Sequence, residues 1–359
     1  TTALDATVQI NVLDTLRRLN RESHLALLLI THDLSIVAEL CNRVYVMHQG
    51  LVVEEADIIE LFEAPKSSYT AGLISAARYL RARRQRADPG STVAAASSPR
   101  VPVLSADRVS RVFRRRSRSG WRRQTVDAVS DISLDVFDGE TLAIVGESGS
   151  GKSTMARMLL GLTPPSRGCI RYRGRDLAPL SSAERLAFRK DVQPVFQDPG
   201  ASLNPRLQVV ASLANVLARH GIAGAQDQRR HAADLLRSVG LDPPEQYLDR
   251  YPYQLSGGQQ QRVAIARAMA VRPRLIIADE PLSSLDMSIQ AQILDLLITL
   301  KRDRNLALVL ISHDLNLVEA VADRVVVMYL GRAVEVGSVG EIFATPRHDY
   351  TKSLLAAKL

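Results

Sequence analysis

Cysteines and long apolar runs are both scarce in this sequence. Its 359 residues include two cysteines, Cys41 and Cys169, which lie too far apart to form a CxxC zinc or redox motif. No other pattern points to an oxidising compartment. The longest apolar runs, such as Leu25 to Ile30 and Leu306 to Ile311, reach about six residues, whereas a helix that spans a bilayer needs about 20. These absences exclude a disulfide scaffold and predict no transmembrane helix.

Acidic residues are the minority, because 46 Lys and Arg outnumber 38 Asp and Glu and give a formal net charge of +8. This excess is local. Residues 78–100 hold six arginines and one acid, residues 108–123 hold eight arginines and no acid, and the rest of the chain carries a net charge of −5. Arginine runs are often solvated loops, so we expect no nucleic-acid partner.

An internal repeat governs the predicted organisation. A length of 359 residues leaves room for two domains, or for one large domain with additions. Residues 1–78 align with residues 282–359 without a gap at a constant offset of 281, and 31 of the 78 positions are identical. Two unrelated segments would not keep one register over this length, so the chain contains a tandem duplication. We expect the first copy to lack its beginning.

Three parts follow from this repeat. Residues 1–78 are predicted to be the C-terminal remnant of a first unit, and residues 101–359 a complete second unit. Residues 79–100 change from arginine-rich to small, Pro- and Ser-containing sequence, which predicts a flexible linker.

Short apolar runs and helical patterns alternate in the second unit. Leu275 to Ala278 is typical of a buried parallel strand, and a helical pattern runs from Ser288 to Arg302. Ser133 to Phe137 and Thr141 to Val145 also predict strands, with Asp138-Gly139 between them as a hairpin turn. This alternation predicts an α/β fold.

Residues 146–153 match the phosphate-loop motif GxxxxGK[ST]. The strand Thr141 to Val145 precedes the loop and the helical run Thr154 to Leu160 follows it, which disfavours the alternative of a glycine-rich turn that binds nothing. Backbone N–H groups of such a loop turn toward phosphate oxygens, the lysine brings charge to the β and γ phosphates, and the serine offers a hydroxyl to Mg²⁺. The predicted nucleotide contacts are Gly146, Glu147, Ser148, Gly149, Ser150, Gly151, Lys152, Ser153 and Thr154.

Two adjacent carboxylates end the apolar strand that begins at Leu275. Side chains alternate along a strand, so Asp279 and Glu280 cannot do the same work. Asp279 suits the Mg²⁺ shell together with Ser153, and Glu280 suits activation of the attacking water. A strand end that is merely solvated is the alternative, and the preceding phosphate loop disfavours it.

The sequence Leu255-Ser-Gly-Gly-Gln, followed by a helical run to Met269, resembles the signature motif of ATP-binding cassette (ABC) ATPases. The resemblance covers residues 101–359. It implies a P-loop NTPase (RecA-like) core with an antiparallel β subdomain and a helical signature subdomain, preceded here by the C-terminal piece of a second copy. It also implies ATP and Mg²⁺ as cofactors. The signature residues, which would meet the γ-phosphate held by another cassette, are Ser256, Gly257, Gly258 and Gln259.

Further roles follow from the same resemblance. Gln197 matches the glutamine loop, which senses Mg²⁺ and the water, and His313 matches the switch histidine that reaches the γ-phosphate; Ser284 to Asp286 match the loop at the dimer interface. The implied catalytic residues are thus Glu280, His313 and Gln197, and the implied metal ligands are Ser153, Gln197 and Asp279. Phe113 fits the place of the adenine-stacking aromatic best, although Trp121 competes and a core aromatic remains an alternative.

A narrower resemblance lies in Phe196 to Arg206, in Tyr251 to Gln254 and in Pro346 to Thr351. These segments are similar to the dipeptide, oligopeptide and nickel importer branch, in which fused double cassettes occur. The branch implies ATP hydrolysis that powers import, transmembrane permease subunits, an indirectly coupled solute-binding protein, a second cassette as partner, and a peripheral position on the cytoplasmic face of the membrane. The alternatives are a soluble ABC ATPase of DNA repair or translation, and a remnant that only binds ATP.

Overall fold

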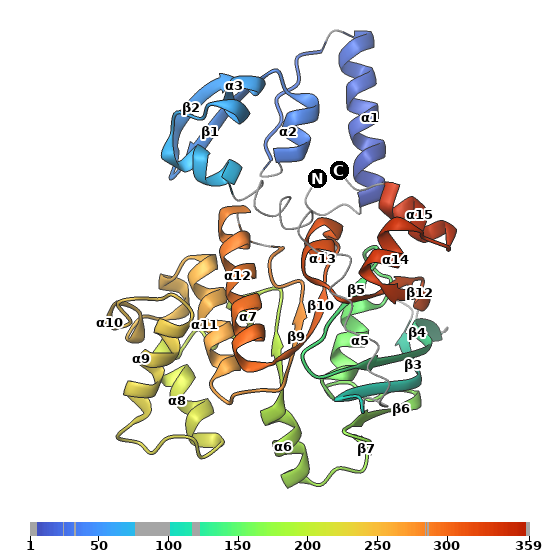
Figure 1. Ribbon diagram of the computed structural model, residues 1–359, viewed down its shortest axis with the longest axis vertical. Coiled ribbons are helices and arrows are strands. Elements are labelled where there is room, and N and C mark those ends of the chain that lie inside the picture. Colours follow the sequence, from blue (N-terminus) through green and yellow to red (C-terminus); the bar gives the residue numbers. More distant parts are fainter. Residues whose placement is uncertain are drawn as a thin grey trace.

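The computed structural model describes residues 6–23, 25–31, 34–75, 101–116, 123–283, 285 and 287–356 (Figure 1). The predicted linker, residues 79–100, lies outside these residues. In the described part of the second unit, strands and helices alternate, which confirms the α/β prediction. No helix among the described residues is both long enough and apolar enough to cross a membrane.

A six-stranded sheet forms the centre of the second unit. Five of its strands run parallel, and only the edge strand β12 is antiparallel to its neighbour. All residues of the three middle strands β5, β10 and β9 are buried, which is why their sequences are continuous apolar runs rather than alternating ones. In spatial order the strands are β12 (Arg332–Ser338), β11 (Arg324–Tyr329), β5 (Thr141–Val145), β10 (Ala307–Ile311), β9 (Leu275–Asp279) and β8 (Val192–Val195).

A four-stranded antiparallel sheet packs beside the central one. Its order is β4 (Arg123–Val136), β3 (Leu104–Arg116), β6 (Arg167–Tyr172) and β7 (Arg175–Asp176). Helix α5 (Lys152–Leu159) buries Met155 and Met158 in an apolar cluster to which both sheets contribute. The expected antiparallel β subdomain is therefore present, and it covers the face of the central sheet that carries α5.

The hairpin predicted around Asp138-Gly139 is wrong. A turn does form there, and Gly139 adopts the positive φ of +72° that favours glycine. However, β4 pairs with β3, whereas β5 pairs with β10 and β11, so the turn joins two different sheets. Thr141–Val145 is apolar on both faces and is buried most completely in the middle of the parallel sheet, which outweighs the local turn signal.

Helices cover the other face of the central sheet and form the expected helical subdomain. Its core joins Leu213, Leu236 and Ile265 to Ile276 and Leu308 of the sheet. The subdomain contains α7 (Pro199–Ser202), α8 (Val209–Arg219), α9 (Gln228–Ser238), α10 (Glu245–Leu248), a 3₁₀ turn (Pro252–Gln254) and α11 (Gly257–Met269). The remaining helices of the second unit are α6 (Ser182–Asp191), α12 (Met287–Arg304), α13 (Leu315–Val321), α14 (Val339–Ala344) and α15 (Asp349–Ala356).

The first copy repeats the last part of the second unit element by element. Its α1, α2, β1, β2 and α3 have the same bounds as α12, α13, β11, β12 and α14 after the offset of 281, and β1 and β2 share the register shift of β11 and β12. In Figure 1 these elements form the upper part of the molecule, where α1 lies beside α15. Their bounds are α1 (Ala6–Ser23), α2 (Leu34–Leu40), β1 (Arg43–His48), β2 (Leu51–Asp57) and α3 (Ile58–Glu63).

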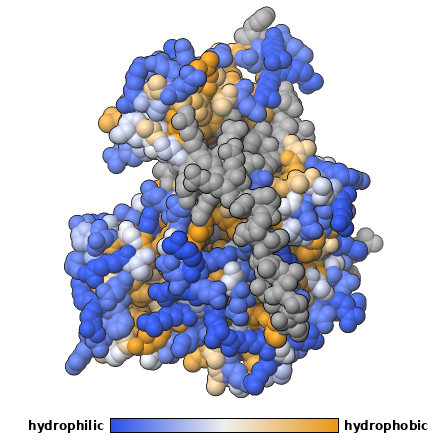
Figure 2. All heavy atoms as spheres, in the orientation of Figure 1, coloured by the Kyte–Doolittle hydropathy of each residue, from blue (hydrophilic) through white to orange (hydrophobic). Residues whose placement is uncertain are grey.

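Burial distinguishes the two copies. Ile30 and Leu28 are 90% and 85% exposed, whereas their counterparts in β10, Ile311 and Val309, are fully buried. Residues 25–31 form no strand, although β10 is one. Figure 2 shows apolar side chains on the surface of this upper part of the molecule. The repeated sequence thus forms its helices and its hairpin locally, but the buried strand needs neighbouring strands on both sides.

Candidate active site

Four predicted site segments follow strands of the central sheet. The phosphate loop (residues 146–153) follows β5, Gln197 follows β8, Glu280 follows β9 and His313 follows β10. These four strands are parallel and adjacent, so their carboxyl ends lie at one edge. Open α/β sheets bind ligands at this edge, and Gln197 is exposed there.

The side chain of Lys152 lies inside the phosphate loop. It is the first residue of α5 and only 5% exposed. Its Nζ donates hydrogen bonds to the carbonyl oxygens of Gly146 at 2.6 Å and of Glu147 at 2.8 Å. Backbone carbonyls therefore compensate the buried ammonium group, which supplies the positive charge that a phosphate ligand needs.

Close backbone contacts shape the loop around two glycines. A Cβ atom at Gly146 would lie 2.1 Å from the carbonyl oxygen of Met328, and one at Gly151 would lie 2.2 Å from that of Ala128. Only glycine fits at either position. Between them, the Oγ of Ser150 is buried without a hydrogen-bond partner in the described structure. An unpaired buried hydroxyl is costly, so this atom fits a site that a phosphate oxygen completes.

Ser153 and Asp279 meet although 126 positions separate them. The Oγ of Ser153 donates a hydrogen bond to Oδ1 of Asp279 at 3.2 Å. Burial raises the pKa of Asp279 above its usual value, and the negative charge of Glu280 adds to this effect. A hydroxyl and a buried carboxylate are oxygen ligands of the kind that Mg²⁺ prefers, and a cation would offset the cost of the buried charge. The donor set therefore fits the predicted metal position.

Glu280 and His313 form a pair beside this position. Nδ1 of His313 lies 3.4 Å from Oε2 of Glu280, and the Glu280 side chain is 18% exposed. The hydrogen bond with His313 lowers the pKa of Glu280, and the same bond raises the pKa of His313. Glu280 also has a φ of +46°, a left-handed conformation that is uncommon outside glycine, and its N–H donates to the carbonyl oxygen of Ile311 at 2.9 Å. The carboxylate is thus ionised and held by the ends of β9 and β10.

The predicted signature residues begin helix α11. The Oγ of Ser256 accepts a hydrogen bond from the backbone N–H of Gln259, and the Gln259 side chain accepts one from the backbone N–H of Ser256, which makes a capping box. A Cβ atom at Gly258 would lie 2.7 Å from Cγ2 of Ile289, so this glycine lets α11 approach α12. Gly257 is exposed and meets no such contact.

Family models match the regions that carry these motifs. Residues 129–283 match the model described as ABC transporter. Residues 53–100 and 334–359 match a second model, described as the oligopeptide/dipeptide transporter C-terminal region. The chain belongs to the ABC transporter family. The second model matches near the end of both copies of the repeat, and its two matches begin at equivalent positions, residues 53 and 334.

Two similar proteins align with nearly the whole of this ABC chain. The glutathione import ATP-binding protein GsiA of Pectobacterium atrosepticum is 42% identical over 378 aligned residues, and GsiA of Escherichia coli strain K12 is 42% identical over 373. In both comparisons the alignment covers 99% of this chain and 60% of the relative. The chain therefore spans about three fifths of the length of these relatives.

Solved ABC structures share the fold. The dimeric post-hydrolysis state of the ATP-binding cassette MJ0796, bound to ADP and Pi, has a TM-score of 0.57 and 28% identity, and covers 66% of this chain and 98% of its own. The cbiO1 protein from Clostridium perfringens has a TM-score of 0.56 and 27% identity, and covers 68% of this chain and 91% of its own. These similarities confirm the predicted cassette fold.

Phe113 lies on β3, with its side chain toward solvent. The residue is 40% exposed, and the guanidinium carbon of Arg111 lies 4.8 Å from the centre of its ring. Phe113 pairs with Val126 on β4, and two residues further along β4 the carbonyl of Ala128 contacts the phosphate loop at Gly151. The exposure argues against a core role and leaves the ring open to a ligand.

Three residues named from the sequence lie outside the described structure. They are Trp121, which competes for the stacking role, and the interface residues Ser284 and Asp286. The stacking aromatic and the interface loop accordingly stay predictions.

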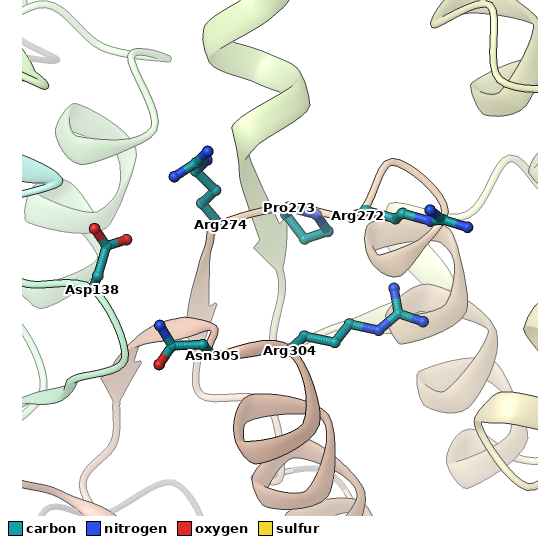
Figure 3. A pocket seen from close by; sticks show the side chains of 6 residues that line it. All are labelled: Asp138, Arg272, Pro273, Arg274, Arg304 and Asn305. Atoms are coloured by element: carbon teal, nitrogen blue, oxygen red, sulfur yellow. The ribbon is translucent and has the colours of Figure 1, made fainter.

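A cavity of about 560 Å³ lies away from these residues (Figure 3). It is situated where β9 and β10 begin, which is the opposite edge of the sheet from Glu280 and His313. In Figure 3 the side chains of Arg272 and Arg304 extend to one side of Pro273, and that of Arg274 points another way. The cavity is therefore no part of the candidate active site.

One contact to the phosphate loop was not expected from the sequence. The hydroxyl of Tyr350, on α15, accepts a hydrogen bond from the backbone N–H of Glu147 at 3.0 Å. Chain positions 203 apart give no local signal of such a contact. The available hint is the recurrence of a tyrosine at the equivalent position, Tyr69.

Proposed function

We propose that this protein binds MgATP and hydrolyses it to power an importer of peptides or related small solutes. It would work as a peripheral subunit on the cytoplasmic face of the membrane, bound to transmembrane permease subunits and coupled through them to a solute-binding protein. Glutathione is one candidate cargo, because the similar GsiA proteins are named for its import.

A single observation carries the proposal. At one edge of the sheet, Ser153 contacts Asp279 at 3.2 Å and Glu280 contacts His313 at 3.4 Å, next to a loop whose lysine is buried among backbone carbonyls. Hydrolysis of a phosphoanhydride is assisted by a phosphate cradle, a metal position, a group that orients water and a donor to the charge on the γ-phosphate. This arrangement supplies a candidate for each of the four.

The roles follow from charge and position. Lys152 and N–H groups of the loop other than that of Glu147, which donates to Tyr350, would hold the β and γ phosphates. Ser153 and Asp279 would hold Mg²⁺, with Gln197 as a further ligand. When bound, Mg²⁺ neutralises charge on the phosphate oxygens. Glu280 accepts a proton from the attacking water, and His313, whose pKa is raised by its hydrogen bond with Glu280, donates a hydrogen bond toward the γ-phosphate.

Two cassettes are needed for a complete site in this proposal. The N-terminus of α11 presents the Ser256 hydroxyl and the exposed backbone of Gly257. Among the described residues, the nearest atom to a Cβ at Gly257 would be Cδ2 of Leu285 at 3.5 Å, an ordinary contact that does not require glycine. A helix N-terminus stabilises a phosphate charge. We infer that these residues face the ATP of a second cassette, and the solved structure of the similar MJ0796 cassette is a dimer.

A concentration series tests hydrolysis and pairing together. Phosphate release from MgATP by the 359-residue chain should be weak at low protein concentration and should rise more steeply than in proportion to it. The variant Lys152→Ala should remove the activity at every concentration. High activity per chain that does not depend on concentration would contradict pairing, and its absence throughout, with no MgATP binding, would refute the ATPase assignment.

Partner capture separates the proposal from its alternatives. Co-purification with permease subunits, tested by expressing the chain beside the permeases encoded near its gene, is the expected result. Salt-dependent binding to nucleic acid at physiological ionic strength would instead favour a soluble ABC ATPase of DNA repair or translation. Binding of MgATP without turnover in the assembled transporter would favour a remnant.

A further inference from the structure

A short turn after α14 is held by one carboxylate. The two oxygens of Glu335, on β12, accept hydrogen bonds from the backbone N–H groups of Arg347 at 2.9 Å and of His348 at 3.1 Å. The backbone N–H of Tyr350 then donates to Nδ1 of His348 at 3.1 Å. The ring of Tyr350 stacks on that of Tyr329, at the end of β11, with 4.1 Å between centroids. These four contacts therefore fix the backbone position of Tyr350 and the orientation of its ring.

The first copy builds the same turn from partly different residues. Glu54 accepts hydrogen bonds from the backbone N–H groups of Lys66 at 2.8 Å and of Ser67 at 3.0 Å. The N–H of Tyr69 donates to the Ser67 hydroxyl at 3.2 Å, and its ring stacks on His48 at 4.0 Å. Of the residues that make these contacts, only the glutamate and the tyrosine are identical in the second copy. The same turn therefore occurs in both copies, and in each copy it holds a tyrosine ring at the equivalent position.

In the second copy this tyrosine reaches the phosphate loop. Its hydroxyl accepts the hydrogen bond from the N–H of Glu147, and the carbonyl of the same residue accepts the one from Lys152. Further along the loop, the carbonyl of Ser150 accepts a hydrogen bond from the N–H of Gly331, in the turn after Tyr329. The C-terminal elements therefore contact the loop at two residues, Glu147 and Ser150. The first of these, Glu147, is also a hydrogen-bond partner of Lys152.

We propose that Tyr350 is a positioning residue for ATP, which acts through the Glu147 backbone to hold the phosphate loop and Lys152 in the binding geometry. The inference rests on the proposed function. In this proposal Tyr350 acts on the backbone of the loop at Glu147 and restricts the loop before the ligand arrives. A preorganised loop loses less conformational freedom on binding, so its contribution appears in affinity rather than in the chemical step.

The substitution Tyr350→Phe tests this in the 359-residue chain, because it removes the hydroxyl and keeps the ring that stacks. The dissociation constant for MgATP should rise about fivefold, the equivalent of one hydrogen bond. KM should rise with it, whereas kcat at saturating MgATP should stay within about twofold. Hydrogen exchange of the peptide that contains Glu147 should become faster without nucleotide.

The chain supplies a matched control, Tyr69→Phe, at the same place in the other copy. This variant should bind MgATP as the unchanged chain does, and both variants should keep the same unfolding midpoint. A second variant, Tyr350→Leu, removes ring and hydroxyl together and should weaken MgATP at least as much as Tyr350→Phe.

The possible outcomes separate this inference from the proposed function. If the unchanged chain does not bind MgATP, the proposed function fails. If it binds MgATP and Tyr350→Phe matches it in affinity and exchange, the positioning role is wrong, and a loss in Tyr350→Leu alone would assign the effect to the ring. An equal loss in Tyr69→Phe would also overturn the inference, because it would show a general structural effect.

Discussion

Replacement of Glu280 by Gln is the most direct test of the candidate active site. Glutamine has the shape of glutamate, and the side chain at this position is largely buried, so the substitution leaves no cavity. The amide can still hydrogen-bond to His313, and the backbone bond to the carbonyl of Ile311 does not involve the side chain. The change therefore removes one negative charge and one proton acceptor, and almost nothing else.

The size of the effect follows from that single loss. A positioned general base contributes about 10² to 10⁴ in rate, which corresponds to roughly 3 to 5 kcal/mol of barrier. Glu280 is held on two sides and stays ionised at neutral pH, so we expect kcat to fall by at least about 100-fold. Binding of MgATP should persist, because the lysine, the loop and the Ser153–Asp279 pair are untouched.

The assay needs two measurements and one control. Phosphate release at saturating MgATP reports the chemical step, and equilibrium binding of MgATP reports the loop. The control Asp303→Asn makes the same change of charge at an exposed pair with Arg302, near the end of α12, and should change neither quantity. Phosphate release from Glu280→Gln at the unmodified rate would refute the assignment, as would a loss of rate explained entirely by lost binding.

Four further substitutions probe the metal position, the C-terminal turn and, with one control, the signature helix. Ser153→Ala should weaken ATP binding about five- to tenfold in the presence of Mg²⁺ and much less with EDTA, as titration calorimetry would show. Burial acts to raise the pKa of Glu335, but hydrogen bonds to the carboxylate outweigh it and lower the pKa, so its stabilisation is present at pH 7 and lost as the pH falls through that lowered value. Glu335→Gln should therefore cost about 1 to 3 kcal/mol in urea unfolding at pH 7, with a smaller difference from the unchanged chain toward about pH 4. Gly258→Ala forces a Cβ against the stiff side chain of Ile289 and should cost about 1 to 3 kcal/mol, whereas Gly257→Ala should leave the unfolding curve in place.

Motifs with a fixed physical context could be predicted from the sequence. The phosphate loop needs a strand before it and a helix after it, and both flanks are local patterns that β5 and α5 confirm. The pairing of Ser153 with Asp279 follows once the loop after β5 and the end of β9 are placed at the same edge of one parallel sheet. The repeat was equally informative, because a constant offset of 281 transfers the bounds of α12, α13, β11, β12 and α14 to α1, α2, β1, β2 and α3, although not those of β10.

Features that depend on distant partners could not be predicted in this way. The Asp138-Gly139 pair is a strong hairpin signal, yet the strand after it joins a different sheet because β10 and β11 bury it better. The left-handed backbone of Glu280 has no sequence signal, since the strain is stabilised by contacts with the end of β10. Residues 25–31 show the same limit, because their sequence resembles β10 closely and still forms no strand.

The two copies also indicate whether the tyrosine-bearing turn or the phosphate loop determines the geometry of the contact between them. The carboxylate-held turn, with its stacked tyrosine, forms in the first copy at Tyr69 as well as at Tyr350. In each copy the contacts that build the turn come from the same copy's own strands and turn residues and do not involve the phosphate loop. It follows that the tyrosine is placed by its own turn and that the loop adapts to it. A C-terminal region that changes position would therefore change ATP affinity through Tyr350, without any contact with the nucleotide.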